Sequence, residues 1–328
     1  MALTRAVTVL ALFVVLAALA LFSLTVGAVH VALADLLRAP HGSRDAAAYV
    51  LQDLRAPRIV AGILVGASLG MGGAILQTAL RNPLADPYLM GASGGAGLSV
   101  AIATVAGAPP GLYGTIAFGG ALAASSVSLG VARGAGPLSQ QRLILAGIGI
   151  SSFCTALTTL VILLAPQTGT ALSILSWLGG SLAGHGWSDV RWATLEGALG
   201  LAIAVSILPS LDAMRLGRER AAGVGVDVAR THLLVVVAAS LLSGAAVTVS
   251  GVIGFVGLLV PNAARVLVGG SVPWLTLACA PLGALVVLIA DLIARGAAPP
   301  LELPVGVLLS VVGVPAFLAL VVRRAQFA

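Results

Sequence analysis

The chain has 328 residues, of which 59% are hydrophobic and only 9% are charged. A soluble globular domain typically carries about 25% charged residues, and a folded core still needs a polar exterior. This composition excludes a water-soluble protein and indicates one that lies in a bilayer.

The charged residues narrow the class of protein further. All 17 cationic side chains are arginine, because the sequence contains no lysine. A P-loop ATP site, a Schiff-base lysine and a kinase site are therefore excluded. The net charge of +6 does not indicate nucleic acid binding, since the arginines are spread between apolar runs, as in membrane-protein loops. The two cysteines and four histidines stand outside metal-ligand spacings, so neither a metal site nor a catalytic residue is predicted.

Apolar segments recur along the whole chain. A spanning helix needs about 20 apolar residues. Ten segments approach that length, near residues 6–28, 58–80, 88–107, 112–133, 142–165, 191–209, 231–250, 253–267, 273–294 and 304–322. The segment at 253–267 is short and interrupted by glycines and a proline, so a broken or partial helix is expected there. The predicted fold is an all-α polytopic membrane protein of about ten spans, with nine or eleven as alternatives, in a single domain over residues 1–328.

The first segment has a second interpretation, a cleaved signal peptide with Ala32 and Ala34 as its small-residue cleavage site. Its apolar run is longer than the usual core of about 7–15 residues. A retained helix is therefore favoured.

The arginines predict the orientation of the chain. With the N-terminus in the cytoplasm and ten crossings, eleven arginines fall on the cytoplasmic side and six on the outside. This distribution satisfies the positive-inside rule and places both termini in the cytoplasm.

Small and acidic residues inside the spans have more than one interpretation. Gly62, Gly66 and Gly70 recur along one helix face, which indicates close helix packing or, alternatively, the border of a solute pathway. Asp291 lies four residues before Arg295, so a structural ion pair is favoured over a proton site. With Glu196 as the other carboxylate inside a span, an ion-gradient-driven secondary transporter is poorly supported, but it remains the alternative function.

The stretch 210–230 is amphipathic, punctuated by glycine and too polar to cross the bilayer. One or two short helices are expected in it. Its composition fits a surface helix on the lipid headgroups and a docking surface for a cytoplasmic partner equally well.

Several ordered motifs resemble one family. The stretch 210–230 resembles the coupling region of FecCD-type permeases, the membrane subunits of type II ABC importers for iron–siderophores, haem and cobalamin. Other stretches agree in order: LRAPRIVAGILVGASLGMGG at 54–73, RNPLADPYLMGASGGAG at 81–97, QRLILAGIGIS at 141–151, WLGGSLAGHGWSDV at 177–190, GFVGLLVPNAARVLVG at 254–269 and ELPVGVLLSVVGVPAFL at 302–318. The similarity runs from about residue 50 to the C-terminus. It departs from the family at Asn262, where a histidine is common, and at Arg218, where an acidic residue is usual.

The resemblance implies a homodimer of ten-helix subunits in the bacterial inner membrane, with the solute path along the dimer axis. Each subunit would rest on one of two cytoplasmic ATP-binding subunits, which bind ATP and Mg²⁺, so that this chain has no cofactor of its own. A periplasmic binding protein would deliver a metal chelate. The chain itself would be a pore-forming subunit and not an enzyme.

Three groups of residues acquire expected roles from the resemblance. ATPase coupling is expected in 210–226, which we call the coupling segment, and a cytoplasmic gate at the turn before residue 88 and at the start of the fifth span. Docking of the binding protein is expected at outward-facing arginines. The residues are Leu216, Gly217, Arg218, Glu219, Ala221 and Gly225 for coupling, Asn82, Leu84, Gln140 and Gln141 for the gate, and Arg55, Arg58 and Arg295 for docking.

Overall fold

A computed structural model describes residues 2–26, 46–134, 140–165, 167–297 and 301–325. Its regular elements are helices, in the order α1 (Ala2–Thr25), α3 (Ala46–Tyr49), the π-helix η1 (Val50–Arg55), α4 (Ala56–Ala79), the short 3₁₀ helix η2 (Pro87–Met90), α5 (Ala92–Val105), η3 (Pro110–Leu112), α6 (Tyr113–Gly134), α7 (Gln140–Leu163), α8 (Thr168–Leu178), α9 (Trp187–Met214), α10 (Arg218–Gly223), α11 (Val228–Ser250), α12 (Val256–Val268), α13 (Val272–Gly296) and α14 (Val305–Ala325).

The all-helical membrane fold is confirmed. In the described part of the chain, seven helices are long and apolar enough to cross a membrane, and four shorter apolar helices accompany them. Each of the ten predicted segments coincides with one of these helices. Helix α8 is not among the predicted segments, because its 11 residues are too few for a 20-residue span.

The predicted partial helix near 253–267 is confirmed as α12, which has 13 residues and contains Pro261. The chain between α11 and α12 is not helical. Gly251 and Phe255, at the two ends of this connection, both have positive φ values, 63° and 68°. Because left-handed backbone interrupts a right-handed helix, α11 and α12 stay separate elements.

The glycine face of α4 packs closely against α13. A Cβ atom added at Gly66 would collide with the backbone of Gly283, and one added at Gly70 would lie 2.6 Å from the carbonyl oxygen of Cys279. The favoured interpretation of this face, helix packing, is therefore correct. Such small-residue contacts let two helix backbones approach closely.

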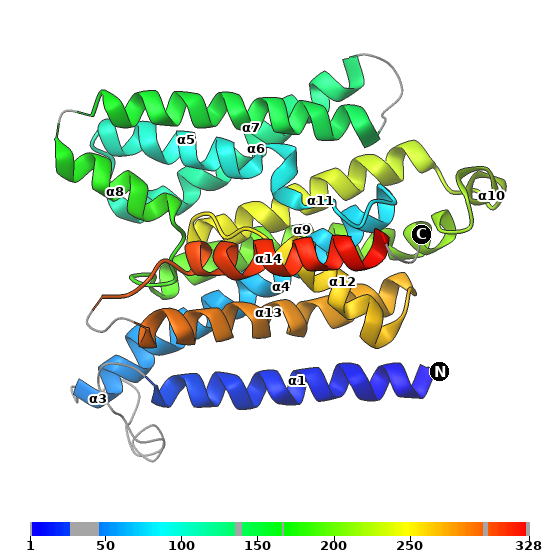
Figure 1. Cartoon of the computed structure of the whole chain (residues 1–328), viewed down its shortest axis with the longest axis horizontal. Coiled ribbons are helices and arrows are strands. Elements are labelled where there is room, and N and C mark those ends of the chain that lie inside the picture. Colours follow the sequence, from blue (N-terminus) through cyan, green and yellow to red (C-terminus); the bar gives the residue numbers. More distant parts are fainter. Residues whose placement is uncertain (1, 27–45, 135–139, 166, 298–300, 326–328) are drawn as a thin grey trace.

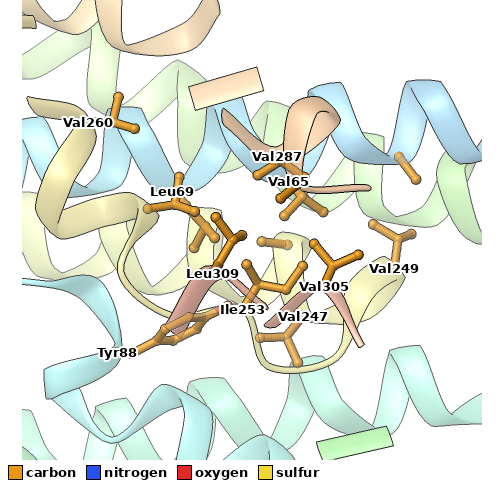
Figure 2. Close-up of a cluster of buried hydrophobic side chains, with 14 of the residues drawn as sticks. Val65, Leu69, Tyr88, Val247, Val249, Ile253, Val260, Val287, Val305 and Leu309 are labelled. Atoms are coloured by element: carbon orange, nitrogen blue, oxygen red, sulfur yellow. The ribbon is translucent and has the colours of Figure 1, made fainter. Parts of the chain in front are cut away.

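A buried apolar cluster joins the central helices (Figure 2). Val65 and Leu69 from α4 meet Val247 from α11, Val287 from α13 and Val305 from α14. The side chains converge on α4, which places this helix in the interior of the bundle.

The two ends of the molecule carry different features (Figure 1). The start of α1, the helix α10 and the end of α14 lie at one end, while α3 and α8 lie at the other. The alternative cleavage site at Ala32 and Ala34 falls outside the described residues.

Candidate functional site

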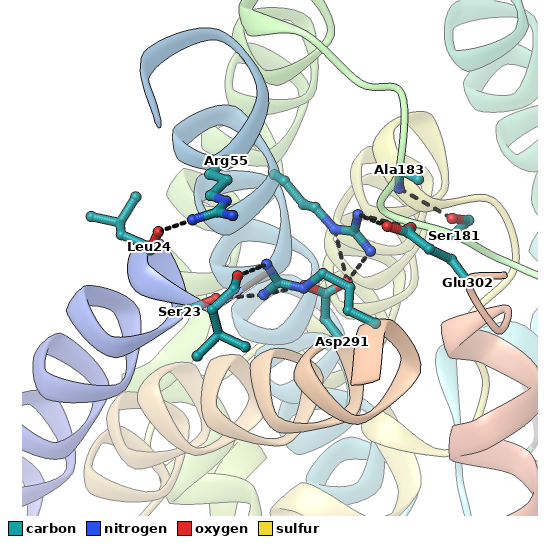
Figure 3. Close-up of polar contacts among 10 residues, drawn as sticks. Ser23, Leu24, Arg55, Ser181, Ala183, Asp291 and Glu302 are labelled. Carbon is teal, nitrogen blue, oxygen red and sulfur yellow. Dashed lines mark hydrogen bonds and ion pairs between the residues drawn. The ribbon is translucent and has the colours of Figure 1, made fainter. Parts of the chain in front are cut away.

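The outer arginines Arg55, Arg58 and Arg295, which we call the outer arginine cluster, lie where α4 begins and α13 ends. Arg58 donates from Nε and Nη2 to Oδ1 of Asp291, at 3.0 and 2.8 Å. Its Nη1 donates to both carboxylate oxygens of Glu302, at 3.1 and 2.9 Å. Arg58 therefore joins a fully buried carboxylate to one that is 42% exposed (Figure 3).

The other two arginines point toward α1. Nη1 of Arg55 donates to the carbonyl oxygen of Leu24 at 2.6 Å. Nη2 of Arg295 donates to Oγ of Ser23 at 2.6 Å, and it also lies 3.0 Å from Oδ2 of Asp291. The cluster therefore fastens the end of α1 to the start of α4 and the end of α13 (Figure 3).

The predicted ion pair between Asp291 and Arg295 is confirmed. Local sequence spacing does not predict the second partner of Asp291, because Arg58 is 233 residues away in the chain. Nor does it predict the role of Glu302, although this residue stands in one of the motifs that carry the resemblance. Only the packing of α4 against α13 brings Arg58 and Asp291 together.

The predicted gate residue Asn82 forms the turn that follows α4. Its Oδ1 accepts a hydrogen bond from the backbone N–H of Leu84 at 2.9 Å, and its carbonyl oxygen accepts one from Ala85. Asparagine commonly starts a turn in this way. Leu84, at the tip of the turn, is exposed.

The other two gate residues begin α7. Gln140 is the first residue of this helix, and the exposed Gln141 follows it. One turn further on, Leu143 and Ile144 line the same small cavity as Ala85 and Asp86. The two predicted gate segments are therefore neighbours within one subunit.

Asn262, where the sequence departs from the family, connects α12 to the gate turn. Its Nδ2 donates to the carbonyl oxygens of Pro83 and Leu258, at 2.9 and 2.8 Å. Its Oδ1 accepts from Nη1 of Arg265 at 3.3 Å. The asparagine is buried and has the structural role of holding Pro83 in place.

The coupling segment contains the short helix that the sequence predicts, α10, after the end of α9. Gly217 lies just before α10 with φ 118° and ψ 150°, a conformation that is essentially restricted to glycine. A Cβ atom added there would meet no atom within 4 Å. Within this chain Gly217 therefore serves the backbone turn and not a close helix contact.

The coupling residues differ in exposure. Leu216 before α10 is 67% exposed and Val224 after it is 74% exposed, while Glu219 and Gly225 also face outward. Ala221, by contrast, is 1% exposed and packs in an apolar cluster of the subunit itself. Its predicted place on the docking face is therefore not supported, because the subunit already covers it.

The two carboxylates inside the spans have partners from this chain. Oε2 of Glu196 on α9 accepts a hydrogen bond from Oγ1 of Thr248 on α11 at 2.7 Å. Asp291 lies between Arg58 and Arg295, as described above. Each carboxylate is therefore bonded to a side chain on a neighbouring helix. Such structural pairing does not favour the secondary-transporter alternative.

Comparison with known proteins decides the family. Residues 15–323 match the model of the FecCD transport family. This chain belongs to the FecCD transport family. It is 36% identical to the Fe(3+)-citrate import system permease protein YfmE of Bacillus subtilis, over 97% of this chain and 95% of that protein. It is 37% identical to the hemin transport system permease protein HmuU of Yersinia pestis, over 96% of this chain and 95% of that protein.

A solved structure gives the same assignment at the level of the fold. The chain is similar to an inward-facing metal-chelate type ABC transporter, with a TM-score of 0.86 and 28% identity over 96% of this chain and 98% of that one. The FecCD chain described here is therefore a multi-span permease of the ABC importer type.

Proposed function

We propose that this FecCD chain is the pore-forming subunit of an ATP-driven importer that moves a metal chelate from the periplasm to the cytoplasm. The observation that carries the proposal is the family match over residues 15–323, together with the fold shared with a metal-chelate type transporter. An iron chelate or haem is the favoured cargo, because relatives are named for iron citrate and hemin.

The working unit would be a homodimer with one cytoplasmic ATP-binding subunit on each copy. The exposed helix α10 supports this arrangement, since a short helix flanked by Leu216 and Val224 offers apolar contact area to a partner groove. ATP and Mg²⁺ would be bound by that partner. ATP hydrolysis by that partner would then shift this chain between inward-open and outward-open helix packings.

The proposed orientation places α10 and both termini in the cytoplasm of a bacterium, with the chain in the inner membrane. Its support is the distribution of arginines along the sequence, eleven on the cytoplasmic side against six outside. The start of α1, α10 and the end of α14 lie at one end of the bundle, as this orientation requires (Figure 1). The opposite end, with the outer arginine cluster, would face the periplasmic binding protein.

Arg58 is the member of the outer arginine cluster that a binding protein could contact with the least rearrangement. Its side chain is 11% exposed and already bonds to the exposed Glu302. Arg55 and Arg295 donate inward to α1, so their contribution to docking would be mainly electrostatic.

The proposed cytoplasmic gate can be tested by crosslinking between two copies. Single cysteines at Leu84 or Gln141 would form a disulfide across the dimer axis in the closed state and block passage. The native Cys154 and Cys279 are free thiols. A variant that lacks both is the appropriate background, because any disulfide then involves only the introduced cysteines. Failure to crosslink in every nucleotide condition would contradict the gate assignment.

Reconstitution tests the function as a whole. Vesicles that contain the permease, the ATPase and the binding protein should take up chelate only with ATP, and vesicles with the permease alone should not. Uptake by the permease alone under an ion gradient would instead support the secondary-transporter alternative. Titration of the binding protein with ferric citrate, hemin and cobalamin would identify the cargo.

A further inference from the structure

Three arginines from separate parts of the chain line a pocket at the end of the bundle that carries α10: Arg81 in the turn after α4, Arg215 just after α9, and Arg265 in α12. The pocket has a volume of about 330 Å³ and is lined by Gln77, Thr78, Arg81, Asn82, Pro83, Arg215, Arg265, Gly270 and Leu275. We call it the arginine pocket. Its volume falls in the range of roughly 300–1,000 Å³ that is common for small-ligand sites.

The described residues that line the arginine pocket include three cations and no carboxylate. Nη1 of Arg265 donates to Oε1 of Gln77 at 2.7 Å, and Arg81 donates to the carbonyl oxygen of Met214. Asp212 lies beside the pocket, 3.2 Å from Nη1 of Arg215. Since guanidinium groups stay charged at physiological pH, the lining attracts an anion.

The backbone of Arg81 also departs from ordinary helical geometry. Its φ is 48°, in the left-handed region that non-glycine residues rarely adopt. This turn ends α4 and sends the chain toward Asn82. The strained residue carries a side chain that lines the pocket.

The pocket lies at the level of the lipid headgroups in the proposed orientation. Arg81 follows the apolar span Val50–Ala79 by two residues, and Gly270 and Leu275 lie at the start of the span Val272–Gly296. Anionic lipids are attracted to basic pockets between helices on the cytoplasmic side of a membrane. Arginine pairs with phosphate groups through two parallel hydrogen bonds.

We infer that the arginine pocket binds the phosphate group of an anionic phospholipid from the cytoplasmic leaflet. This inference rests on the orientation given under the proposed function. Because Arg81 contacts Met214, the last residue of α9, the bound lipid would support the backbone that leads into the coupling segment. Lipid composition would thereby affect how firmly α10 is held.

The test uses the purified full-length permease, delipidated in detergent and mixed with phosphatidylglycerol and phosphatidylcholine in equal amounts. Native mass spectrometry should detect retained phosphatidylglycerol in excess over phosphatidylcholine. Arg81→Gln and Arg265→Gln should each reduce that retention about fivefold. The matched control is Arg133→Gln, an exposed arginine at the end of α6, and it should leave retention unchanged.

A second variant tests the pocket without removing an arginine, in case the arginine variants fail to fold. Gly270→Glu keeps all three arginines and places a carboxylate at the pocket wall, next to the flexible end of Arg215. It should abolish preferential retention while the gel-filtration profile stays that of the parent protein. Retention equal to the parent protein in this variant would overturn the inference.

Two further measurements separate other anions from lipid. If inorganic phosphate stabilises the delipidated protein against heat and phosphatidylglycerol does not, the site takes free phosphate and the lipid assignment fails. If Arg81→Gln retains phosphatidylglycerol but weakens ATPase binding, the pocket accepts acidic side chains of that partner, which also overturns it. Because retention is measured without transport, its failure would leave the importer proposal standing.

Discussion

Nδ2 of Asn262 lies 2.9 Å from the carbonyl oxygen of Pro83, although 179 residues separate the two in the chain. The bond ties α12 to the turn that is proposed to close the cytoplasmic end of the pathway. Any movement of that turn must therefore carry α12 with it or break a buried hydrogen bond.

Replacement of Asn262 by alanine should destabilise the protein by about 1–3 kcal/mol, because it removes the side-chain donor to the carbonyl oxygen of Pro83. Thermal unfolding in detergent would measure the change. Asn262→His, which restores a ring N–H donor, should recover part of the loss. Equal stability of the alanine variant and the parent protein would show that Asn262 does not hold the turn.

Asp291 is fully buried between two arginines, so its removal should be far more damaging than that of the exposed Glu302. Asp291→Ala leaves two guanidinium groups without their shared carboxylate and should cost about 3–5 kcal/mol. Glu302→Gln should change stability by less than about 1 kcal/mol. Fluorescence-detected gel filtration after heating would compare the two variants, and similar losses would contradict the proposed difference.

Gly217→Leu should uncouple ATP hydrolysis from transport, because leucine cannot easily adopt φ 118° and the start of α10 would shift. We expect a several-fold lower ratio of chelate imported to ATP hydrolysed in the reconstituted complex, with dimer assembly unchanged. The control is Gly130→Leu in α6, outside the coupling segment, where an added side chain also meets open space and φ is ordinary. Normal coupling in Gly217→Leu would contradict the assignment.

Burial raises the pKa of Asp86, in the loop between α4 and α5, from 3.8 to about 6. The folded state therefore binds this proton more tightly than the unfolded state, so the contribution of Asp86 to stability increases as the pH falls. Between pH 7 and pH 5 the gain should be about 1 kcal/mol. Thermal unfolding across this range would measure it.

Asp86→Asn isolates this effect, because the amide keeps an oxygen that can accept from the backbone N–H of Tyr88. The variant should lack the gain on acidification. Burial lowers the pKa of His185, whose contribution decreases as the pH falls below 6.5, and this opposing effect is common to both proteins. If both proteins respond identically to pH, Asp86 is not the group responsible.

Charge changes within the outer arginine cluster and at its neighbour Glu302 should change docking of the binding protein in opposite directions. Arg55→Glu/Arg58→Glu should slow association and make it less sensitive to salt, since a favourable long-range attraction is lost. Glu302→Gln removes a carboxylate bonded to Arg58 and should accelerate association at low salt. Stopped-flow titration at low and high ionic strength would measure both rates, and an unchanged rate in the double variant would exclude these arginines from the docking site.

Composition and the lengths of the apolar runs are sufficient to predict the class of protein and most of its helices. Apolar runs of helical length predict all ten segments, because the bilayer requires each spanning segment to satisfy its own backbone. Local spacing also predicts the ion pair of Asp291 with Arg295, since the two residues lie four positions apart on one helix.

Helix packing determines which residues far apart in the chain come into contact. The bonds from Arg58 to Asp291 and from Asn262 to Pro83 exist because α4 packs against α13 and α12, and no local spacing encodes that packing. The same holds for Ala221, which the family resemblance places on a docking face and which the subunit itself covers. Helical periodicity indicates which residues share a face of a helix, but only the packed neighbours determine what that face contacts.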